Sequence, residues 1–226
     1  MKTAMILAAG RGERLRPLTD LCPKALCTIH NTPLIEYHVS RLAQAGFERI
    51  IINHAYLGGK IRHYLGDGQR FGVHILYSPE PPGALETGGG ILNALPLLGD
   101  APFLTVNADI YTNYSFKSLH LPAASLAHLV LVNTPASHHT SDFGLSNTHH
   151  VTNDHKLYTF SGIACYHPRF FDDCVPGRYS VTPLLRAMAD NRQISGEIHT
   201  DVWFDIGSPE RLEYVYEQVF NMLDAP

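Results

Sequence analysis

Glycines and cations follow directly on the first apolar residues of the chain. Residues 3–6 read TAMI, and residues 7–24 read LAAGRGERLRPLTDLCPK. Small residues let backbone N–H groups approach an anion closely, and arginine and lysine side chains can surround that anion. The small residues are Ala9, Gly10 and Gly12, and the cations are Arg11, Arg14, Arg16 and Lys24. This pattern predicts a site for a nucleoside triphosphate or for a ligand equally rich in phosphate.

Two common phosphate-binding motifs do not describe this segment. A dinucleotide-binding loop requires GxGxxG, but Leu15 stands where the third glycine would be. A P-loop requires GxxxxGK followed by Ser or Thr, and no segment of the chain has that pattern. A glycine-rich turn with solvated arginines is the structural alternative. The extended pattern GxGxRxxPLTxxxPK is more specific than a lone GxG and favours the phosphate site.

The elements that must position these residues follow an alternating pattern. Short apolar segments predict strands at residues 3–8, 49–53, 73–77, 103–106, 128–132, 156–166 and 202–205. Helical patterns fall at residues 33–45, 59–65, 91–97, 181–189 and 209–222, the last with Ser208 as its N-cap. This alternation predicts an α/β fold with a mostly parallel sheet covered on both faces. Ligands of such sheets bind at the carboxyl ends of the strands, where residues 7–24 begin.

The alternation breaks between residues 134 and 157. This segment is polar and contains the phrase DFGL and five of the fourteen histidines, namely His138, His139, His149, His150 and His155. We expect a β-ribbon with loops that form the rim or lid of a pocket. The histidines lack a helical i, i+4 register, so we expect them to be solvated loop residues and not a metal site.

Bulk composition excludes several classes of protein. The chain has 226 residues, 45% of them hydrophobic, and a formal net charge of -4. These values predict one domain over residues 1–226 and argue against a nucleic-acid partner, which normally meets a basic face. The N-terminal apolar run is too short for an export signal, and no segment approaches the roughly 20 apolar residues of a membrane span. Four cysteines without a CxxC pair fit free thiols, so we expect a cytoplasmic protein without a membrane partner.

Several segments together resemble the sugar-1-phosphate nucleotidyltransferase family. LAAGRGERLRPLTDLCPKAL is similar to its signature, and EPPGALETGGG, LTVNADI, DFGL, FSGI and WFDIGSPE follow in the family's order. The resemblance implies a Rossmann-like (GT-A-like) mixed sheet with helices on both faces and a small β lid. It also implies transfer of a nucleotidyl group from a nucleoside triphosphate to a sugar 1-phosphate, with release of pyrophosphate. Many members carry a C-terminal left-handed β-helix, which we do not expect here.

The subgroup is indicated by length and by four motifs. ETGGG, VNAD, FSGI and WxDIG in a compact chain are most similar to the N-acetylmuramate 1-phosphate uridylyltransferases of cell-wall recycling. Mannose-1-phosphate guanylyltransferases and glucose-1-phosphate nucleotidyltransferases are the alternatives. The expected partners are therefore the two small-molecule substrates, and the expected assembly is a monomer or a small homo-oligomer.

Two aspartates at the ends of expected strands are the metal ligands that the resemblance implies. Asp109 lies in NADI, and Asp205 lies in WFDIG. Either one alone would be typical of a loop cap, whereas both together, in a chain with a phosphate loop, favour a metal. Mg²⁺ prefers oxygen ligands and bridges substrate phosphates. The expected cofactor is therefore Mg²⁺.

The remaining roles follow from phosphate chemistry and from the resemblance. We expect Arg14 at the β- and γ-phosphates, where a planar guanidinium helps most, and Lys24 at the α-phosphate and the incoming phosphate. With Asp109 these are the expected catalytic residues. No general base is needed, because a sugar phosphate has a second pKa of about 6 and is largely dianionic at neutral pH. The expected nucleotide-binding residues are Ala9, Gly10, Arg11, Gly12, Lys24, Glu80, Thr87 and Gly88.

Base and sugar recognition are less specific in the sequence. Glu80 is the candidate for the base, but a carboxylate accepts equally from uracil and from guanine, so UTP is favoured only by the subgroup. The residues at the family's sugar-pocket positions are Asn107, Gly144, Ser161 and Gly162. The small residues Gly162 and Ala164 are compatible with a bulky sugar substituent. Many relatives bind the sugar phosphate with a Glu–Lys pair, where this chain offers only Asp154 and Lys156.

Two other classes of protein share some of these features. A nucleotide-sugar glycosyltransferase would usually present a D-x-D motif, whereas this chain has Asn107-Ala108-Asp109. It would also have no need of the RxxPLTxxxPK segment. A non-catalytic homologue would be expected to have lost one of its four key charged residues. This chain retains all four, which are Arg14, Lys24, Asp109 and Asp205.

Overall fold

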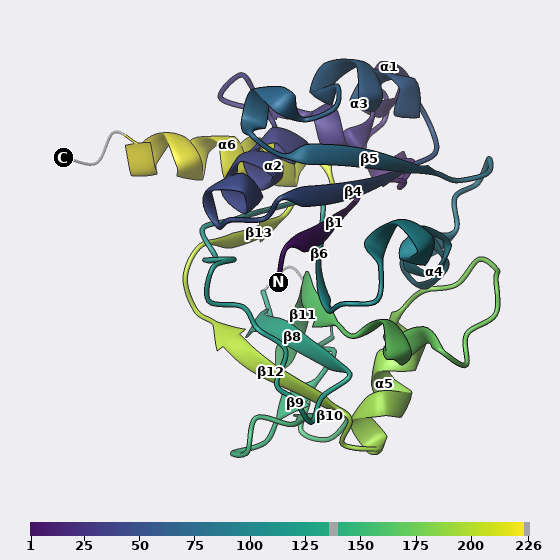
Figure 1. Ribbon diagram of the computed structural model, residues 1–226. Helices are drawn as coiled ribbons and strands as arrows, with labels where there is room; N and C mark the ends of the chain where they lie inside the picture. The colour runs from purple at the N-terminus through teal and green to yellow at the C-terminus, as the bar shows by residue number, and fades with distance from the viewer. Residues whose placement is uncertain (136–139, 224–226) are drawn as a thin grey trace.

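The computed structural model describes residues 1–135 and 140–223. Seven strands form a central sheet in the order β12-β8-β11-β6-β1-β4-β5 (Figure 1). Their bounds are β1 Thr3–Leu7, β4 Arg49–His54, β5 His74–Pro79, β6 Phe103–Asn107, β8 Ala127–Asn133, β11 Tyr158–Tyr166 and β12 Ile194–His199. Within this sheet β11 runs antiparallel to β6 and β8, and the other pairings are parallel. The sheet is therefore mixed and mostly parallel, as the alternation predicted.

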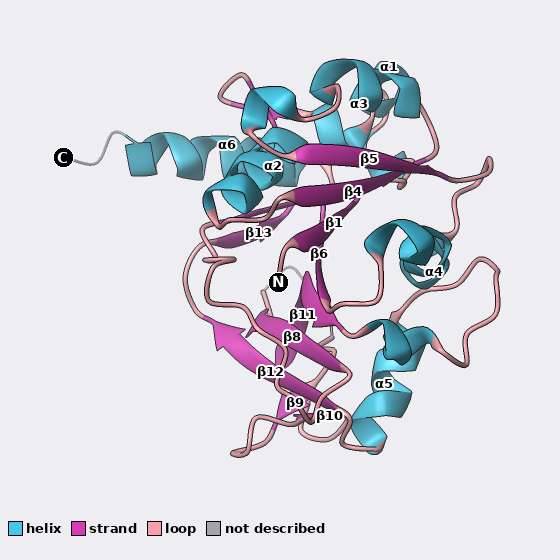
Figure 2. Ribbon diagram, in the orientation of Figure 1, coloured by secondary structure: helices cyan, strands magenta, loops and turns pink. Residues whose placement is uncertain are grey.

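Helices cover both faces of the sheet (Figure 2). The α-helices are α1 Leu18–Leu21, α2 Leu34–Gln44, α3 Gly58–Leu65, α4 Glu86–Leu98, α5 Thr182–Asp190 and α6 Pro209–Leu223. Successive side chains of a strand point to opposite faces. Ile6 of β1 accordingly packs in one core with Val39 of α2, while Met5 packs in the other with Ile91 of α4. Helices α2 and α3 thus cover one face, and α4 and α5 cover the other.

Three pairs of short strands complete the fold. Their bounds are β2 Thr28–Ile29 with β3 Thr32–Pro33, β7 Ile110–Thr112 with β13 Trp203–Asp205, and β9 Gly144–Leu145 with β10 Val151–Thr152. The β9–β10 pair is the ribbon expected between residues 134 and 157. His138 and His139 of that segment lie outside the described residues.

Four strands were not predicted from the sequence, namely the short pair β2 and β3, and β7 and β12. The edge strand β12 reads ISGEIH and pairs parallel with β8. Its serine, glycine and glutamate interrupt the apolar run that marks a buried strand. The strand β7 has only three residues. It pairs with β13, which lies about ninety positions away in the sequence, so no local pattern predicts it.

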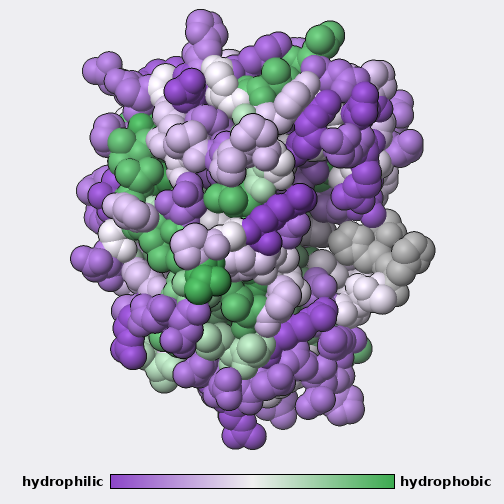
Figure 3. Space-filling view, turned by 90° about the vertical axis from the view of Figure 1, so that its right-hand side faces the viewer, coloured by the Kyte–Doolittle hydropathy of each residue, from purple (hydrophilic) through white to green (hydrophobic). Residues whose placement is uncertain are grey.

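The last helix begins and packs as its sequence predicts. The hydroxyl of Ser208 accepts a hydrogen bond from the Arg211 N–H at 3.4 Å, and Pro209 is the first helical residue. Val215 of α6 packs beside Leu34 in a third, smaller core. On the face that carries α4 and α5, apolar surface is divided by hydrophilic side chains (Figure 3). Within residues 1–135 and 140–223, no helix is long and apolar enough to cross a membrane.

Candidate active site

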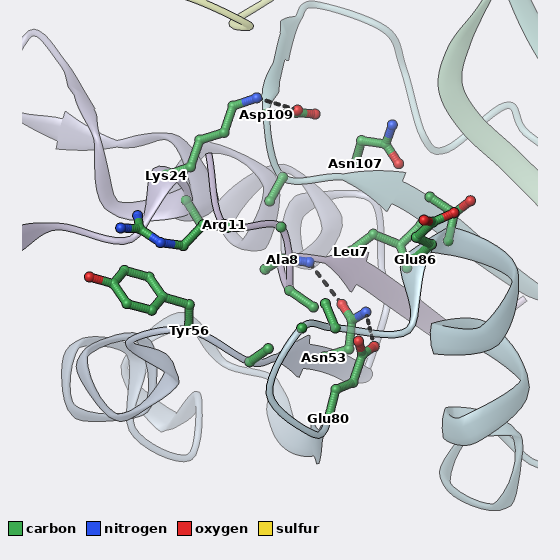
Figure 4. A pocket seen from close by; sticks show the side chains of 18 of the residues that line it. Leu7, Ala8, Arg11, Lys24, Asn53, Tyr56, Glu80, Glu86, Asn107 and Asp109 are labelled. Carbon is green, nitrogen blue, oxygen red and sulfur yellow. Dashed lines mark hydrogen bonds and ion pairs between the residues drawn. The ribbon is translucent and has the colours of Figure 1, made fainter. Parts of the chain in front are cut away.

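A cavity of about 820 Å³ lies at the carboxyl edge of four parallel strands (Figure 4). Leu7 of β1, Asn53 of β4 and Asn107 of β6 line it, together with Glu80 immediately after β5. Ligands of open α/β sheets bind at this edge, because the loops that leave adjacent strands converge there. We refer to this space as the first cavity.

The glycine-containing loop forms one wall of the first cavity. Ala9, Gly10 and Arg11 line it. Gly12 lies behind them, where a backbone φ of 70° turns the chain and brings it against Lys24. In the described part of the chain, the backbone N–H groups of residues 9–12 donate to no other group. Four neighbouring donors without a partner are an arrangement that binds phosphate oxygens.

Arg11 is held by the chain on three sides. Its guanidinium donates to the Thr19 carbonyl at 2.7 Å and to the Asp20 carboxylate at 2.9 Å, and it lies 3.7 Å from the centre of the Tyr56 ring. The hydrogen bond with Asp20 raises the pKa of Arg11 and lowers the pKa of Asp20. Arg11 therefore holds the shape of the loop in addition to its place in the wall.

Lys24 and Asp109 meet in the cavity although 85 positions separate them. The Lys24 Nζ donates to Asp109 Oδ2 at 2.5 Å, and the Lys24 side chain is 13% exposed. Lys24 begins a single 3-10 turn, Lys24–Leu26, and Asp109 follows β6 by two residues. The structure thus brings together two of the three residues that the sequence indicated as catalytic.

Asp109 directly precedes β7, and Asp205 is the last residue of β13, which pairs with β7. Asp205 pairs with Ile110, and the Ile206 N–H donates to the Asp109 carbonyl at 2.8 Å. Each carboxylate also has a cationic neighbour, Lys24 for Asp109 and Arg211 for Asp205. Both carboxylates line one cavity, and carboxylate oxygens are the ligands that Mg²⁺ prefers, so the pair fits that ion. No group of three or more metal-binding side chains occurs among the described residues, so water and substrate would complete the coordination.

Arg14 lies on the Asp205 side of the site. Its side chain is exposed and does not line the first cavity. A Cβ added to Gly207 would lie 3.0 Å from the Arg14 guanidinium and 3.3 Å from that of Arg211. Arg14 therefore lies beside Gly207, two residues after Asp205, while Arg211 pairs with the Asp205 carboxylate itself. Contact of Arg14 with the β- and γ-phosphates stays a prediction.

A buried network joins three strand ends beneath the cavity. Asn53 accepts from the Ala8 N–H at 2.8 Å and donates to Glu80 Oε1 at 2.7 Å. The second carboxylate oxygen of Glu80 accepts from the Leu85 N–H at 2.7 Å. Glu80 therefore anchors the loop that follows β5. Recognition of a base by Glu80 would use the lone pairs that this network leaves, and it stays a prediction.

Helix α4 begins five residues earlier than the sequence pattern indicates, because it includes the glycines of ETGGG. Glycine is unfavourable in the interior of a helix, so tertiary contacts must explain why these positions are helical. A Cβ on Gly88 would lie 2.6 Å from the Tyr179 ring, and one on Gly89 would lie 2.0 Å from the Gly177 carbonyl oxygen. Because these glycines have no side chains, the segment 177–181 can pack closely against the helix.

The same docking decides where Thr87 and Gly88 lie. Thr87 lines the first cavity, and its hydroxyl accepts from the Val181 N–H at 2.9 Å. Gly88 does not line that cavity, and its N–H donates to the Tyr179 carbonyl at 2.9 Å. Thr87 is thus placed to meet a nucleotide, whereas the Gly88 N–H is used in packing.

A second cavity of about 480 Å³ adjoins the first, and Asn107 and Asp109 line both. The remaining residues that line it are Ile110, Thr140, Asp142, Thr159, Phe160, Ser161, Trp203 and Asp205. Carboxylates and aromatic rings together suit a sugar, whose hydroxyls donate and whose C–H faces pack on rings. Asn107 and Ser161, two of the expected sugar residues, lie here.

The other two expected sugar residues have packing roles. A Cβ on Gly144 would lie 2.1 Å from the Asp154 carbonyl oxygen, which shows how closely the ribbon folds there. Gly162 has a φ of 82° and lies against the Asn107 side chain. Ala164, expected near the sugar, is fully buried in the core beneath α4 and α5. Room for a bulky substituent therefore does not come from Ala164.

Several residues that line the first cavity were not singled out in the sequence, among them Asn53, Tyr56 and Arg178. Asn53 is near the end of β4 and Tyr56 follows that strand, and the position of Asn53 at a buried strand end was a usable signal. Arg178 lies in the loop before α5, and its Nε lies 3.2 Å from Glu86 Oε1. No local pattern marks Arg178, because only the docking of its segment on α4 brings it to the cavity.

Comparison with known proteins agrees with this geometry. A family model described as Nucleotidyl transferase matches residues 3–221. An N-acetylmuramate alpha-1-phosphate uridylyltransferase of Neisseria meningitidis serogroup B is 48% identical over 219 residues, which are 93% of this chain and 95% of that one. A protein of the same name from Caulobacter vibrioides is 32% identical over 225 residues, 92% of this chain and 93% of that one.

Solved structures show the same fold. An inositol-1-phosphate CTP transferase from T. maritima superposes with a TM-score of 0.80 at 20% identity, over 100% of this chain and 97% of that one. A UDP-glucose pyrophosphorylase in complex with UDP-glucose superposes with a TM-score of 0.82 at 19% identity, over 98% and 99%. The expected fold is thereby confirmed. The matched family model and the two relatives show that this chain belongs to the nucleotidyl transferase family.

Proposed function

We propose that this protein transfers the uridylyl group of UTP to N-acetylmuramic acid 1-phosphate, with UDP-N-acetylmuramic acid and pyrophosphate as products. The observation that carries the proposal is the 48% identity, over 93% of the chain, with an N-acetylmuramate alpha-1-phosphate uridylyltransferase. The adjoining cavities support it, because one presents N–H donors that bond to no described residue and the other presents carboxylates and aromatic rings.

The reaction needs positioning and charge stabilisation more than it needs proton transfer. An oxygen of the sugar phosphate attacks the α-phosphorus of UTP. A new P–O bond forms as the bond to the β-phosphate oxygen breaks, and pyrophosphate leaves with the bonding electrons. The N–H groups of residues 9–12 bind the triphosphate, and Lys24 holds the α-phosphate and the incoming phosphate together.

Asp109 and Asp205 would hold Mg²⁺ at the boundary of the two cavities. When bound, the ion neutralises charge that the two phosphate groups bring together. Arg211, beside Asp205, and Arg14, beside Gly207, supply further positive charge on that side. We assign the reaction to the cytoplasm and to the recycling of cell-wall sugars. The four cysteines, all of which have free thiols, fit that compartment.

A matrix of substrates tests the proposal. Pyrophosphate release is measured for each pair of UTP, GTP, CTP or dTTP with N-acetylmuramic acid, N-acetylglucosamine, glucose or mannose 1-phosphate. UTP with N-acetylmuramic acid 1-phosphate is expected to give the highest kcat/KM. A tenfold higher value for GTP with mannose 1-phosphate, about 1.4 kcal/mol of transition-state preference, would overturn the substrate assignment.

A further inference from the structure

Arg178 is a cation in the wall of the first cavity, but it is not part of the loop proposed to bind the triphosphate. Arg11, Lys24 and Arg178 are the lysines and arginines among the described residues that line this cavity. Arg11 is held within its own loop, and Lys24 is paired with Asp109. The Nε of Arg178 lies 3.2 Å from Glu86 Oε1, and the Arg178 side chain is 63% exposed. Within the described chain, its two Nη nitrogens donate to no other residue, so they are available to a ligand.

The backbone on both sides of Arg178 is fixed against α4. The Tyr179 N–H donates to the Leu85 carbonyl at 3.1 Å, and the Tyr179 carbonyl accepts from Gly88 at 2.9 Å. On the other side, Gly177 lies against Gly89 so closely that no side chain fits between them. A segment held in this way presents Arg178 from a rigid support. The glycines of ETGGG therefore serve, through packing, to place this arginine.

The partner of Arg178 is itself in an unusual conformation. Glu86 has a φ of 59°, in the left-handed region that side chains other than glycine rarely adopt. Strain of this kind persists where the surrounding structure enforces it, and it concentrates at binding sites. The strained backbone directs the Glu86 carboxylate to the Arg178 guanidinium at the cavity wall.

The Arg178–Glu86 pair lies on the sugar side of the first cavity. Figure 4 shows Glu86 across the cavity from Lys24 and Arg11, on the same side as Asn107. Asn107 also lines the second cavity. That second cavity has three carboxylates and, among its described residues, no lysine or arginine. A negatively charged substituent on the sugar would be repelled there and attracted toward Arg178.

We propose that Arg178 binds the carboxylate of the lactyl substituent of the sugar and thereby selects an anionic sugar 1-phosphate. A planar guanidinium can bind a carboxylate with two parallel hydrogen bonds, which gives both affinity and orientation. This inference rests on the proposed function, because N-acetylmuramic acid differs from N-acetylglucosamine by that lactyl ether. Arg178 is a specificity-determining residue, distinct from the groups that stabilise the reacting phosphates.

Substrate discrimination tests this assignment. The kcat/KM for N-acetylmuramic acid 1-phosphate and for N-acetylglucosamine 1-phosphate, each with UTP, is compared in the wild type and in Arg178→Gln and Arg178→Glu. If the second sugar is not turned over, its inhibition constant against the first replaces kcat/KM. Arg169→Gln is the matched control, because Arg169 is an exposed arginine of the 3-10 turn Pro168–Phe171 and lines neither cavity.

Arg178→Gln is expected to lower kcat/KM for the lactyl-bearing sugar about 10- to 100-fold, mainly through KM. The other sugar should stay within about threefold of the wild type, and Arg178→Glu should have a larger effect on the lactyl-bearing sugar. Equal losses on both sugars, or no loss on either, would overturn the assignment. If the wild type itself does not turn over N-acetylmuramic acid 1-phosphate, the proposed function fails first, and that result is visible before any variant is made.

Discussion

The two adjoining cavities differ in charge, although they share Asn107 and Asp109. The first cavity has three cations in its wall and a loop whose N–H groups donate to no described residue. The second is lined by Asp142, Asp205 and Asp109, with the rings of Trp203 and Phe160. A polyanion suits the first cavity and an uncharged sugar ring suits the second. The difference indicates which half of each substrate goes where.

The residues shared by the cavities lie where the two substrates must meet. Asp109 follows β6, and its carbonyl accepts from the N–H of Ile206, the residue after Asp205. At such a boundary one phosphate comes from each side, and a carboxylate pair with Mg²⁺ would lie between them. The strongest test of the comparison is therefore to remove the boundary carboxylates.

Asp109→Asn and Asp205→Asn are each expected to lower kcat at least about 10³-fold, because the metal contributes several kcal/mol of charge stabilisation. EDTA should abolish pyrophosphate release in the wild type, and added Mg²⁺ should restore it. Circular dichroism of each variant serves as the control for folding. Full activity in EDTA or in either variant would contradict the assignment of a metal to the boundary.

Lys24→Ala tests the phosphate side of the comparison. Since charge crowding is greatest in the transition state, we expect a loss of about 10²–10⁴ in kcat, the range for removal of one electrostatic stabiliser. The measurement is initial rate against the concentration of each substrate. A rise in KM at constant kcat would instead mean that Lys24 binds ground state and transition state equally.

Gly162→Val tests the sugar side, and the structure changes the expected result. A Cβ at this position would lie 2.5 Å from the Asn107 side-chain nitrogen, at a φ of 82°. We therefore expect a loss of about 1–3 kcal/mol in the free energy of unfolding. Activity should fall alike for all sugars, because Asn107 is displaced. Selective loss of the lactyl-bearing sugar alone would show that residue 162 faces the substituent.

Glu80→Gln tests whether the floor of the first cavity depends on its buried network. Both Glu80 oxygens accept hydrogen bonds, and an amide can keep only one of them. Urea denaturation should show a loss of about 1–2 kcal/mol in the free energy of unfolding. Because loosening of the loop 80–85 acts on the nucleotide side, KM for UTP should rise more than KM for the sugar. Asn93→Ala, which removes a part-buried hydrogen bond from α4 to Ser78 of β5 and leaves the Glu80 network in place, is the control.

Glu197 lies in neither cavity and offers the smallest effect. The hydrogen bond from His128, followed by one from Tyr114, lowers the pKa of Glu197 below its ordinary value of 4.5. A carboxylate whose pKa is lowered on folding stabilises the folded protein at a pH above its ordinary pKa. This contribution is lost as the pH falls through the pKa of the folded state. Urea denaturation from about pH 5 to about pH 3 should show this loss, and Glu197→Gln should reduce it. Activity at neutral pH should be unchanged in that variant.

The site residues that could be predicted are those that neighbouring residues in the sequence mark. Gly10, Gly12 and Lys24 lie within one short motif, and the structure places all three in or directly behind one wall. Asp109 follows one apolar strand and Asp205 ends another, which is a local signal as well. By contrast, the sequence placed Ala164 near the sugar, whereas the pleat of β11 turns it into the core.

The α4 glycines show why part of the fold could not be predicted. Local propensity excluded ETGGG from the helix and started it at Ile91, whereas α4 begins at Glu86. The contacts that outweigh propensity come from Tyr179 and from Glu80, which are distant in sequence or on another element. Propensity scales hold no information about such partners.

The sequence by itself determined the α/β alternation, the phosphate loop and the two carboxylates, because each depends on neighbouring residues or on strand ends. Tertiary structure alone decided that Lys24 meets Asp109, that Glu80 is used beneath the cavity and that Arg178 reaches its wall. These contacts join residues that are far apart in the chain or on different elements. Their geometry is set by how whole elements pack, and no local pattern of residue types specifies that packing.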